Sequence, residues 1–163
     1  MNKIVPLLLA APLTVFAEPD SGFPNTYGFG AGVEYGGLGF NLARVSDRDM
    51  KYVSLGWIGI NDEDENVFGF SLGWIRTDLF NMDSNRHGFG ISLGQIGYEE
   101  YFEPVGNDRY VERKRNILGI SLGYTYFGNG IDRPGMRYGI SWVETDAKSV
   151  PDSGIAFSIG YRF

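Results

Sequence analysis

Residues 155–163 read Ile155-Ala156-Phe157-Ser158-Ile159-Gly160-Tyr161-Arg162-Phe163 and alternate large apolar side chains with small or polar ones. In an extended strand, successive side chains point to opposite faces. The large apolar members therefore share one face: Ile155, Phe157, Ile159, Tyr161 and Phe163. The pattern predicts a β-strand with one face in an apolar environment.

The same pattern recurs along the chain. Residues 68–74 read Phe-Gly-Phe-Ser-Leu-Gly-Trp, with close copies at 89–95 and 118–124 and weaker ones at 53–57 and 138–142. The copies are irregularly spaced, so they do not form a solenoid, and turn residues separate them. We therefore expect a hairpin array with strands near 27–35, 38–45, 50–60, 66–76, 87–101, 111–127, 135–145 and 153–163.

Eight such strands predict an all-β fold, namely a closed antiparallel transmembrane β-barrel with up-and-down meander topology. Eleven residues at a tilt near 45° rise about 26 Å, which matches the apolar band of such barrels. Inside hydrocarbon every backbone polar group needs a partner within the protein, so the sheet must close. A soluble sandwich would alternate too, but its outward face would be polar.

The first residues predict a cleaved signal peptide. Lys3 gives a positive start, and residues 4–16 form an apolar run of about 13 residues, shorter than the roughly 20 that a spanning helix needs. Small side chains at Val15 and Ala17 suit signal peptidase. We expect residues 1–17 to be removed and residues 18–163 to form the β-barrel domain.

Composition excludes several classes of partner and site. The net charge is −6, which disfavours nucleic acid as a partner. The chain has no Cys, so neither disulfides nor thiolate metal sites are available. We expect no cofactor and no metal.

The terminal strand resembles the assembly signal of bacterial outer-membrane β-barrels, in which apolar residues alternate up to a final aromatic residue. The residues that carry the resemblance are Phe157, Ile159, Tyr161 and Phe163. With its eight predicted strands, the mature chain resembles the small barrels of the OmpA-like, OmpX-like and OmpW-like class. The resemblance implies the bacterial outer membrane as location, with membrane lipids, lipopolysaccharide and the assembly machinery as partners. It also implies that the terminal strand finishes in the periplasm.

The predicted inward face is lined by very small residues at mid-height: Gly69, Ser71, Gly73, Gly90, Ser92, Gly94, Gly119, Ser121 and Gly123. An eight-stranded barrel is normally just wide enough for side chains to fill it. Three interpretations follow from this lining. The lumen is open and admits a small solute, the barrel flattens, or something enters it.

Larger inward residues are expected near the two rims. The period-two pattern places Glu34, Tyr98, Glu100, Arg113 and Arg115 towards the outer mouth. It places Tyr52, Arg137 and Arg162 towards the periplasmic end. These charges could form a salt-bridged plug, a constriction that selects solutes, or ordinary solvated rims. The acidic run 62–65 either binds divalent cations that bridge lipopolysaccharide or is a solvated loop.

Catalysis is not expected. The single histidine, His87, begins the fifth predicted strand on its lipid side, and position 89, two residues on, is Phe where a lipid A deacylase would have Ser. A His–Ser mechanism needs hydrogen-bond contact between the two side chains. The sequence thus favours a structural or surface-interaction barrel, with a narrow channel or binding slot for a small or apolar molecule as the alternative and a lipid A modifying enzyme as a distant third.

Overall fold

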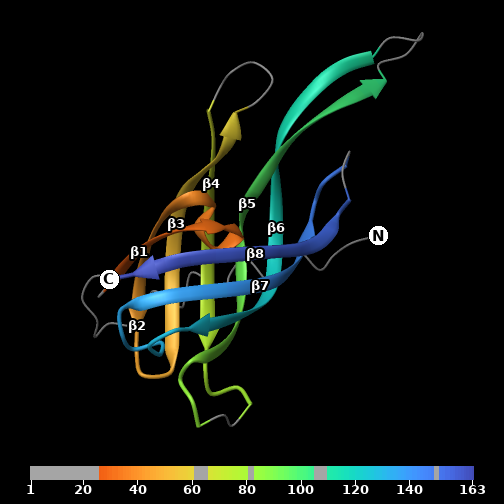
Figure 1. Cartoon of the computed structure of the whole chain (residues 1–163). Helices are drawn as coiled ribbons and strands as arrows, with labels where there is room; N and C mark the ends of the chain where they lie inside the picture. The colour runs from red at the N-terminus through yellow and green to blue at the C-terminus, as the bar shows by residue number, and fades with distance from the viewer. Residues whose placement is uncertain (1–25, 61–65, 81–82, 105–109, 149–150) are drawn as a thin grey trace, which may run out of the picture.

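Eight antiparallel strands close into a barrel in which each strand lies beside its neighbour in sequence and β8 lies beside β1 (Figure 1). The structure is a computed structural model that describes residues 26–60, 66–80, 83–104, 110–148 and 151–163. The strands are β1 (Thr26–Gly32), β2 (Gly37–Val45), β3 (Asp49–Ile60), β4 (Asn66–Arg76), β5 (His87–Pro104), β6 (Tyr110–Phe127), β7 (Gly135–Thr145) and β8 (Ser153–Arg162). The predicted fold class, a closed eight-stranded meander, is confirmed. No helix within the described ranges is long and apolar enough to cross a membrane.

The repeated small-residue motif sets the alignment of neighbouring strands. Across β5 and β6, Gly90 lies opposite Gly123 and Ser92 lies opposite Ser121. Directly paired residues share a face of the sheet, so the small side chains gather inside and the large ones outside. A slip of one residue would exchange the two faces, and the pattern therefore fixes the register.

The outer wall is built of large apolar side chains. Those more than a third exposed include Phe29, Leu38, Phe40, Leu42, Leu55, Phe68, Phe70, Leu118, Leu122, Ile140, Trp142, Ile155, Phe157 and Ile159. Soluble monomers rarely expose so large a continuous apolar surface. This exterior, on a closed barrel, favours a membrane-spanning protein. In a closed barrel each strand pairs on both sides, so no unpaired strand edge has to face lipid.

The first strand ends earlier than the sequence predicts. The prediction continued it to residue 35, but β1 ends at Gly32 and a 3₁₀ turn, η2 (Val33–Tyr35), folds into the barrel. Tyr35 is therefore fully buried. Gly32 and Gly36 have φ of 116° and 66°, the left-handed region that favours glycine. A period-two pattern cannot detect this reversal, because it holds only while the strand continues.

A β-bulge in β5 exchanges the faces of the residues that follow it. The register shifts between Gln95 and Gly97, so the alternation moves by one residue. Glu99 now points inward and is 4% exposed. The prediction that Tyr98 and Glu100 face inward is wrong for this reason.

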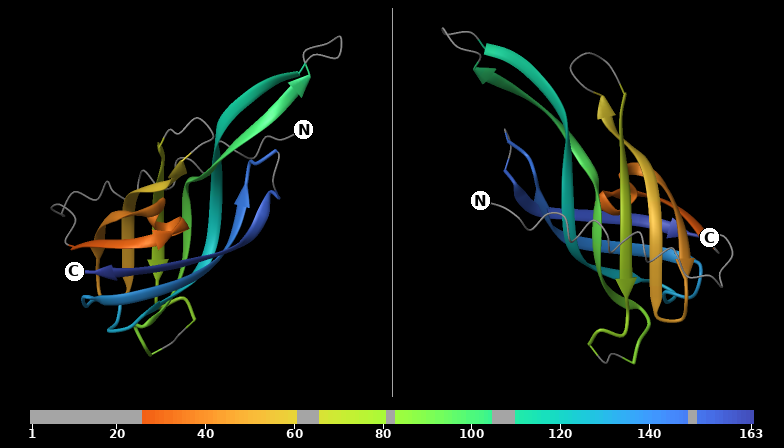
Figure 2. Two further views of the ribbon diagram at one scale, coloured as in Figure 1. Left: turned by 45° about the horizontal axis from the view of Figure 1, so that its top comes forward. Right: turned by 180° about the vertical axis from the view of Figure 1, so that it is seen from behind.

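The β5–β6 hairpin is longer than the barrel wall. Its ladder has 17 register pairs, whereas β4 pairs with β5 only as far as Gly94 and β7 pairs with β6 only from Gly119. The distal parts of both strands project beyond the neighbouring strands (Figure 2). The predicted connection from Phe102 to Tyr110 is too long, because β5 continues to Pro104. We call this the hairpin end of the barrel, and the opposite end the Phe163 end.

A short seam joins the first and last strands. Within the described residues β1 and β8 share four register pairs, the last of which joins Ala31 to Ile159. At the Phe163 end the backbone N–H of Phe163 donates to the Tyr27 carbonyl at 2.9 Å, and the two rings stack with centroids 5.1 Å apart. Phe163, a predicted assembly residue, thus lies where the barrel closes.

The face assignment predicts different costs for charges on and beyond the wall. Leu55→Arg places a guanidinium at the middle of the outer face of β3 and is expected to reduce the free energy of unfolding by about 2–4 kcal/mol. Asn116→Arg, on the outward face of the projecting part of β6, is expected to cost about 0–1 kcal/mol. Reversible urea unfolding in lipid vesicles measures both. Equal costs would contradict the assignment of the wall to lipid.

Candidate functional site: the filled barrel interior

The inserted turn η2 occupies the space that the small inward residues leave. A Cβ atom at Gly160 would overlap the Tyr35 ring, and one at Gly56 would meet the Tyr35 backbone oxygen. The predicted glycine lining therefore makes room for a segment of the same chain. Of the three interpretations of the lumen, the structure has the one in which something enters it.

A buried ion pair lies in the barrel interior. The Arg137 guanidinium on β7 donates to the Glu34 carboxylate on η2, and the Thr125 hydroxyl on β6 donates to the other carboxylate oxygen at 3.0 Å. Arg137 also stacks over the rings of Tyr35 and Tyr52, at 4.8 and 5.4 Å from their centroids. The two charges are 4% and 1% exposed, so each depends on the other for compensation.

The backbone of η2 is also hydrogen-bonded to the barrel wall. The Ser54 hydroxyl on β3 donates to the Glu34 carbonyl oxygen at 2.7 Å. Contacts from β3, β6 and β7 thus converge on one residue. This positions η2 with respect to strands on different sides of the barrel.

A second layer closes the Phe163 end. Ile131, in the connection between β6 and β7, is fully buried in an apolar cluster with Ala43, Met50, Tyr52, Ile75 and Phe127. The Arg162 guanidinium donates to the carbonyl oxygens of Ile131 and Arg133 and so ties this connection to β8. The connection is longer than a tight turn because it covers the end of the barrel.

The connection between β4 and β5 supports the same closure. The Ile131 N–H donates to the Asn85 carbonyl at 2.9 Å, and the Asn85 side-chain amide donates to Asp132 at 2.7 Å. The two long connections therefore contact each other across the Phe163 end.

Little free space remains between these layers. An interior cavity beside Glu34, Tyr52, Ser92, Ser121 and Thr125 measures about 10 Å³, about the minimum volume that holds one water molecule. The Ser92 and Ser121 hydroxyls contact each other at 2.6 Å. This cavity, lined by described residues only, is too small for a solute larger than a water molecule.

The predicted rim charges are distributed differently from the prediction. Glu34 was placed at the outer mouth by continuing the first strand, but the turn carries it inside to Arg137. Arg137 and Arg162 are buried at inward positions towards the Phe163 end. The remaining predicted rim charges form a ladder along the projecting hairpin: Arg115–Glu99 at 2.7 Å, Arg113–Glu103 at 3.0 Å and Lys114–Glu100 at 3.5 Å.

Sequence reasoning missed two residues that fill the interior, Tyr35 and Ile131. Each lies in a connection next to glycine: Gly36 follows Tyr35, and Gly130 precedes Ile131. A large apolar or aromatic residue beside a turn glycine was the sequence feature that could have indicated these buried residues.

The groups considered for catalysis and metal binding do not converge. His87 Nδ1 lies 2.7 Å from the Tyr124 hydroxyl on the outer face, whereas the repeat serines Ser92 and Ser121 lie inside. Among the described residues no three His, Cys, Asp or Glu side chains are grouped as a metal site requires. The acidic run 62–65 lies outside the described residues, as does the predicted signal peptide.

Fold and interior together define the class of protein: a closed eight-stranded antiparallel barrel with an apolar exterior and a lumen filled by its own chain. No protein-family model matches the chain, and searches of curated proteins and of solved structures found no match.

The buried pair predicts a non-additive double-mutant cycle. Glu34→Leu or Arg137→Met alone leaves an unpaired buried charge and is expected to cost about 3–5 kcal/mol of unfolding free energy. The double variant leaves no charge and is expected to cost less than either single variant. Urea unfolding in vesicles measures the four proteins. Additive losses would show that the two charges do not depend on each other.

The filled lumen predicts that added volume inside the barrel is destabilising. A Cβ at Gly73 would overlap the Tyr52 ring, so Gly73→Ala is expected to cost about 1–3 kcal/mol. The cost is expected to shrink in a Tyr52→Val background, which removes the ring. Gly154→Ala is the control, because a Cβ there meets no described atom within 4 Å. If Gly73→Phe folded normally and changed conductance in planar bilayers, an open lumen would replace the filled one.

Proposed function

We propose that the protein is an integral bacterial outer-membrane β-barrel with a structural or surface-interaction role. The observation that carries the proposal is the interior: η2 and Ile131 fill the barrel, and the Glu34–Arg137 pair holds the filling in place. A barrel occupied by its own chain is suited to anchoring rather than to transport. Its partners are outer-membrane lipids, lipopolysaccharide and the outer-membrane assembly machinery.

The location is supported by the combination of closure and an apolar wall. A spanning β-structure must pair its strands all round, and bacterial single-chain barrels have an even number of strands. The eight strands pair in a closed order and place Leu, Ile, Phe and Trp side chains outward. Tyr27, Tyr138 and Tyr161 lie outward towards the Phe163 end, where an aromatic ring suits a membrane interface.

The projecting hairpin supports the surface-interaction role. Phe102 and Tyr110 are 70% and 66% exposed, and both lie on the same face, because Tyr110 pairs with Pro104 two residues beyond Phe102. The distal edges of β5 and β6 lie beyond their pairing with β4 and β7. Exposed aromatic rings on one face of a projecting hairpin are a feature that accepts a protein partner.

The charge ladder keeps this hairpin ordered outside the wall. Glu99 accepts hydrogen bonds from Arg115 at 2.7 Å and from the Lys148 backbone N–H at 2.9 Å. Arg115 also lies 3.6 Å from Asp146. The hairpin is thereby tied to the connection between β7 and β8, so that it presents a defined surface.

The two other functions are less well supported. A channel or binding slot needs space that the interior cavity of about 10 Å³ does not provide. A lipid A modifying enzyme needs a histidine beside a nucleophile, and among the described residues the side-chain hydrogen-bond partner of His87 is the Tyr124 hydroxyl. We therefore propose that the protein has no catalytic activity.

Single-cysteine labelling in intact bacteria tests location and orientation together, because the chain has no natural cysteine. Phe102→Cys is expected to react with a membrane-impermeant maleimide on whole cells, since it lies on the projecting hairpin. Asp132→Cys, at the Phe163 end, is expected to react only after the outer membrane is permeabilised. Recovery of both proteins in the heat-modifiable outer-membrane fraction is the control for folding.

The pattern of labelling separates the possible failures. Labelling of Asp132→Cys but not of Phe102→Cys on whole cells would reverse the orientation and remove the surface role of the hairpin. Recovery of folded protein in a soluble fraction would contradict the membrane location itself.

A further inference from the structure

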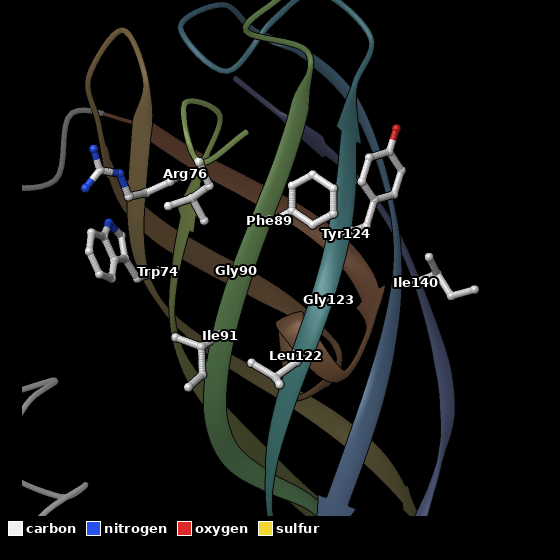
Figure 3. Close-up of a pocket in the computed structure, with 10 residues that line it drawn as sticks. Trp74, Arg76, Phe89, Gly90, Ile91, Leu122, Gly123, Tyr124 and Ile140 are labelled. Carbon is white, nitrogen blue, oxygen red and sulfur yellow. The ribbon is translucent and has the colours of Figure 1, made fainter. Parts of the chain in front are cut away.

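A groove of about 600 Å³ crosses the outer wall over β4 to β7 near the Phe163 end (Figure 3). It runs between two rows of outward side chains. The row nearer the Phe163 end is Arg76, Phe89, Tyr124 and Ile140. The other row is Trp74, Ile91 and Leu122. The paired glycines Gly90 and Gly123 lie between the rows (Figure 3).

The groove is inclined with respect to the ends of the strands. Its first row begins at Arg76, the last residue of β4, and continues through Phe89, the third residue of β5. It then passes Tyr124, three residues before Phe127 at the end of β6, and reaches Ile140, the middle residue of β7. The row therefore climbs from the rim of the barrel into the middle of the apolar wall. Four strands about 4.8 Å apart give it a length of about 14 Å.

The two ends of the groove differ in polarity. At the rim, Arg76 forms a bidentate pair with Asp78 at 2.8 and 2.5 Å, and both side chains remain about a third exposed. The Trp74 indole N–H donates to Asp49 at 2.6 Å. The far end, at Leu122 and Ile140, is apolar and exposed. Apart from Arg76 the lining is mainly apolar and includes Leu79, so a molecule that matches it is apolar along about 14 Å and carries its charges beside Arg76 and Asp78 at the rim.

We infer that the groove binds one acyl chain of a zwitterionic phospholipid, with the phosphate beside Arg76, the amine beside Asp78 and the chain directed towards Ile140. The Arg76–Asp78 pair presents one charge of each sign, which complements the two charges of such a headgroup. The inclination matches a lipid whose headgroup lies at the rim and whose chain enters the wall. This inference rests on the proposed membrane location.

Fluorescence quenching by brominated lipid tests the inference, because Trp74 lies in the wall of the groove. One variant keeps Trp74 alone, with Trp57→Phe and Trp142→Phe. The matched control carries Leu42→Trp with all three native tryptophans replaced by Phe. Leu42 is outward and exposed on β2, three residues before the last residue of that strand, and Trp74 lies two residues before the last residue of β4. Both proteins are reconstituted in vesicles with increasing fractions of phosphatidylethanolamine brominated on its acyl chains.

Trp74 is expected to reach half-maximal quenching at a severalfold lower fraction of brominated lipid than the control tryptophan. Ile91→Phe, which adds a ring to the groove, is expected to abolish the difference, whereas Leu55→Phe on β3 is expected to leave it unchanged. Brominated stearate, which lacks the phosphate and the amine, is expected to show no preference for Trp74.

The outcomes distinguish the groove from the membrane location. Equal quenching at the two positions, or a preference that survives Ile91→Phe, would overturn the lipid site while leaving the protein in the bilayer. A preference shared by stearate would overturn headgroup recognition at Arg76 and Asp78. Absence of quenching at both positions would instead contradict the proposed membrane location.

Discussion

Tyr35 lies so close to β1 and β8 that only glycine fits opposite it, because a Cβ at Gly30 or Gly160 would overlap its ring. This close contact determines the rest of the interior. It brings Glu34 to Arg137, ends β1 at Gly32, and leaves the seam with β8 short. An eight-stranded barrel normally fills its lumen from its own strands. Here the strands contribute little volume and a connection contributes the rest.

The interior consists of a polar layer and an apolar layer, which have different physical roles. In the layer around Glu34 and Arg137, the main interaction is the attraction between the two buried charges. Such a pair adds little net stability to the fold, but a position of η2 that separated the two charges would be unfavourable. Around Ile131, burial of apolar surface dominates, at about 25 cal/mol per Å². The apolar layer stabilises the closed end, and we interpret the polar layer as the device that selects one position for η2.

The strands were predictable from the sequence because their repeats obey a strict period of two. Predicted limits such as 66–76 and 135–145 agree with β4 and β7. The residues that fill the barrel interior were not predictable in the same way, because the chain reversal at Gly32 and the bulge in β5 interrupt the alternation of inward and outward side chains. Glu34 and Glu100 were misplaced for these two reasons, while Arg137, inside a regular strand, lies on the inward face as expected.

The unequal lengths of the two ladders at β5–β6 and β1–β8 have a consequence for the order of folding. The hairpin joins strands that are adjacent in sequence through 17 pairs, so its loop-closure entropy is small. Among the described residues, the seam joins the first and last strands through four pairs, from Gly28–Arg162 to Ala31–Ile159. The barrel should therefore grow outward from the β5–β6 hairpin and close last at β1 and β8. In the folded protein, separating β1 from β8 breaks fewer backbone hydrogen bonds than separating β5 from β6. The backbone amides of the seam should therefore exchange with solvent before those of the β5–β6 hairpin within the wall.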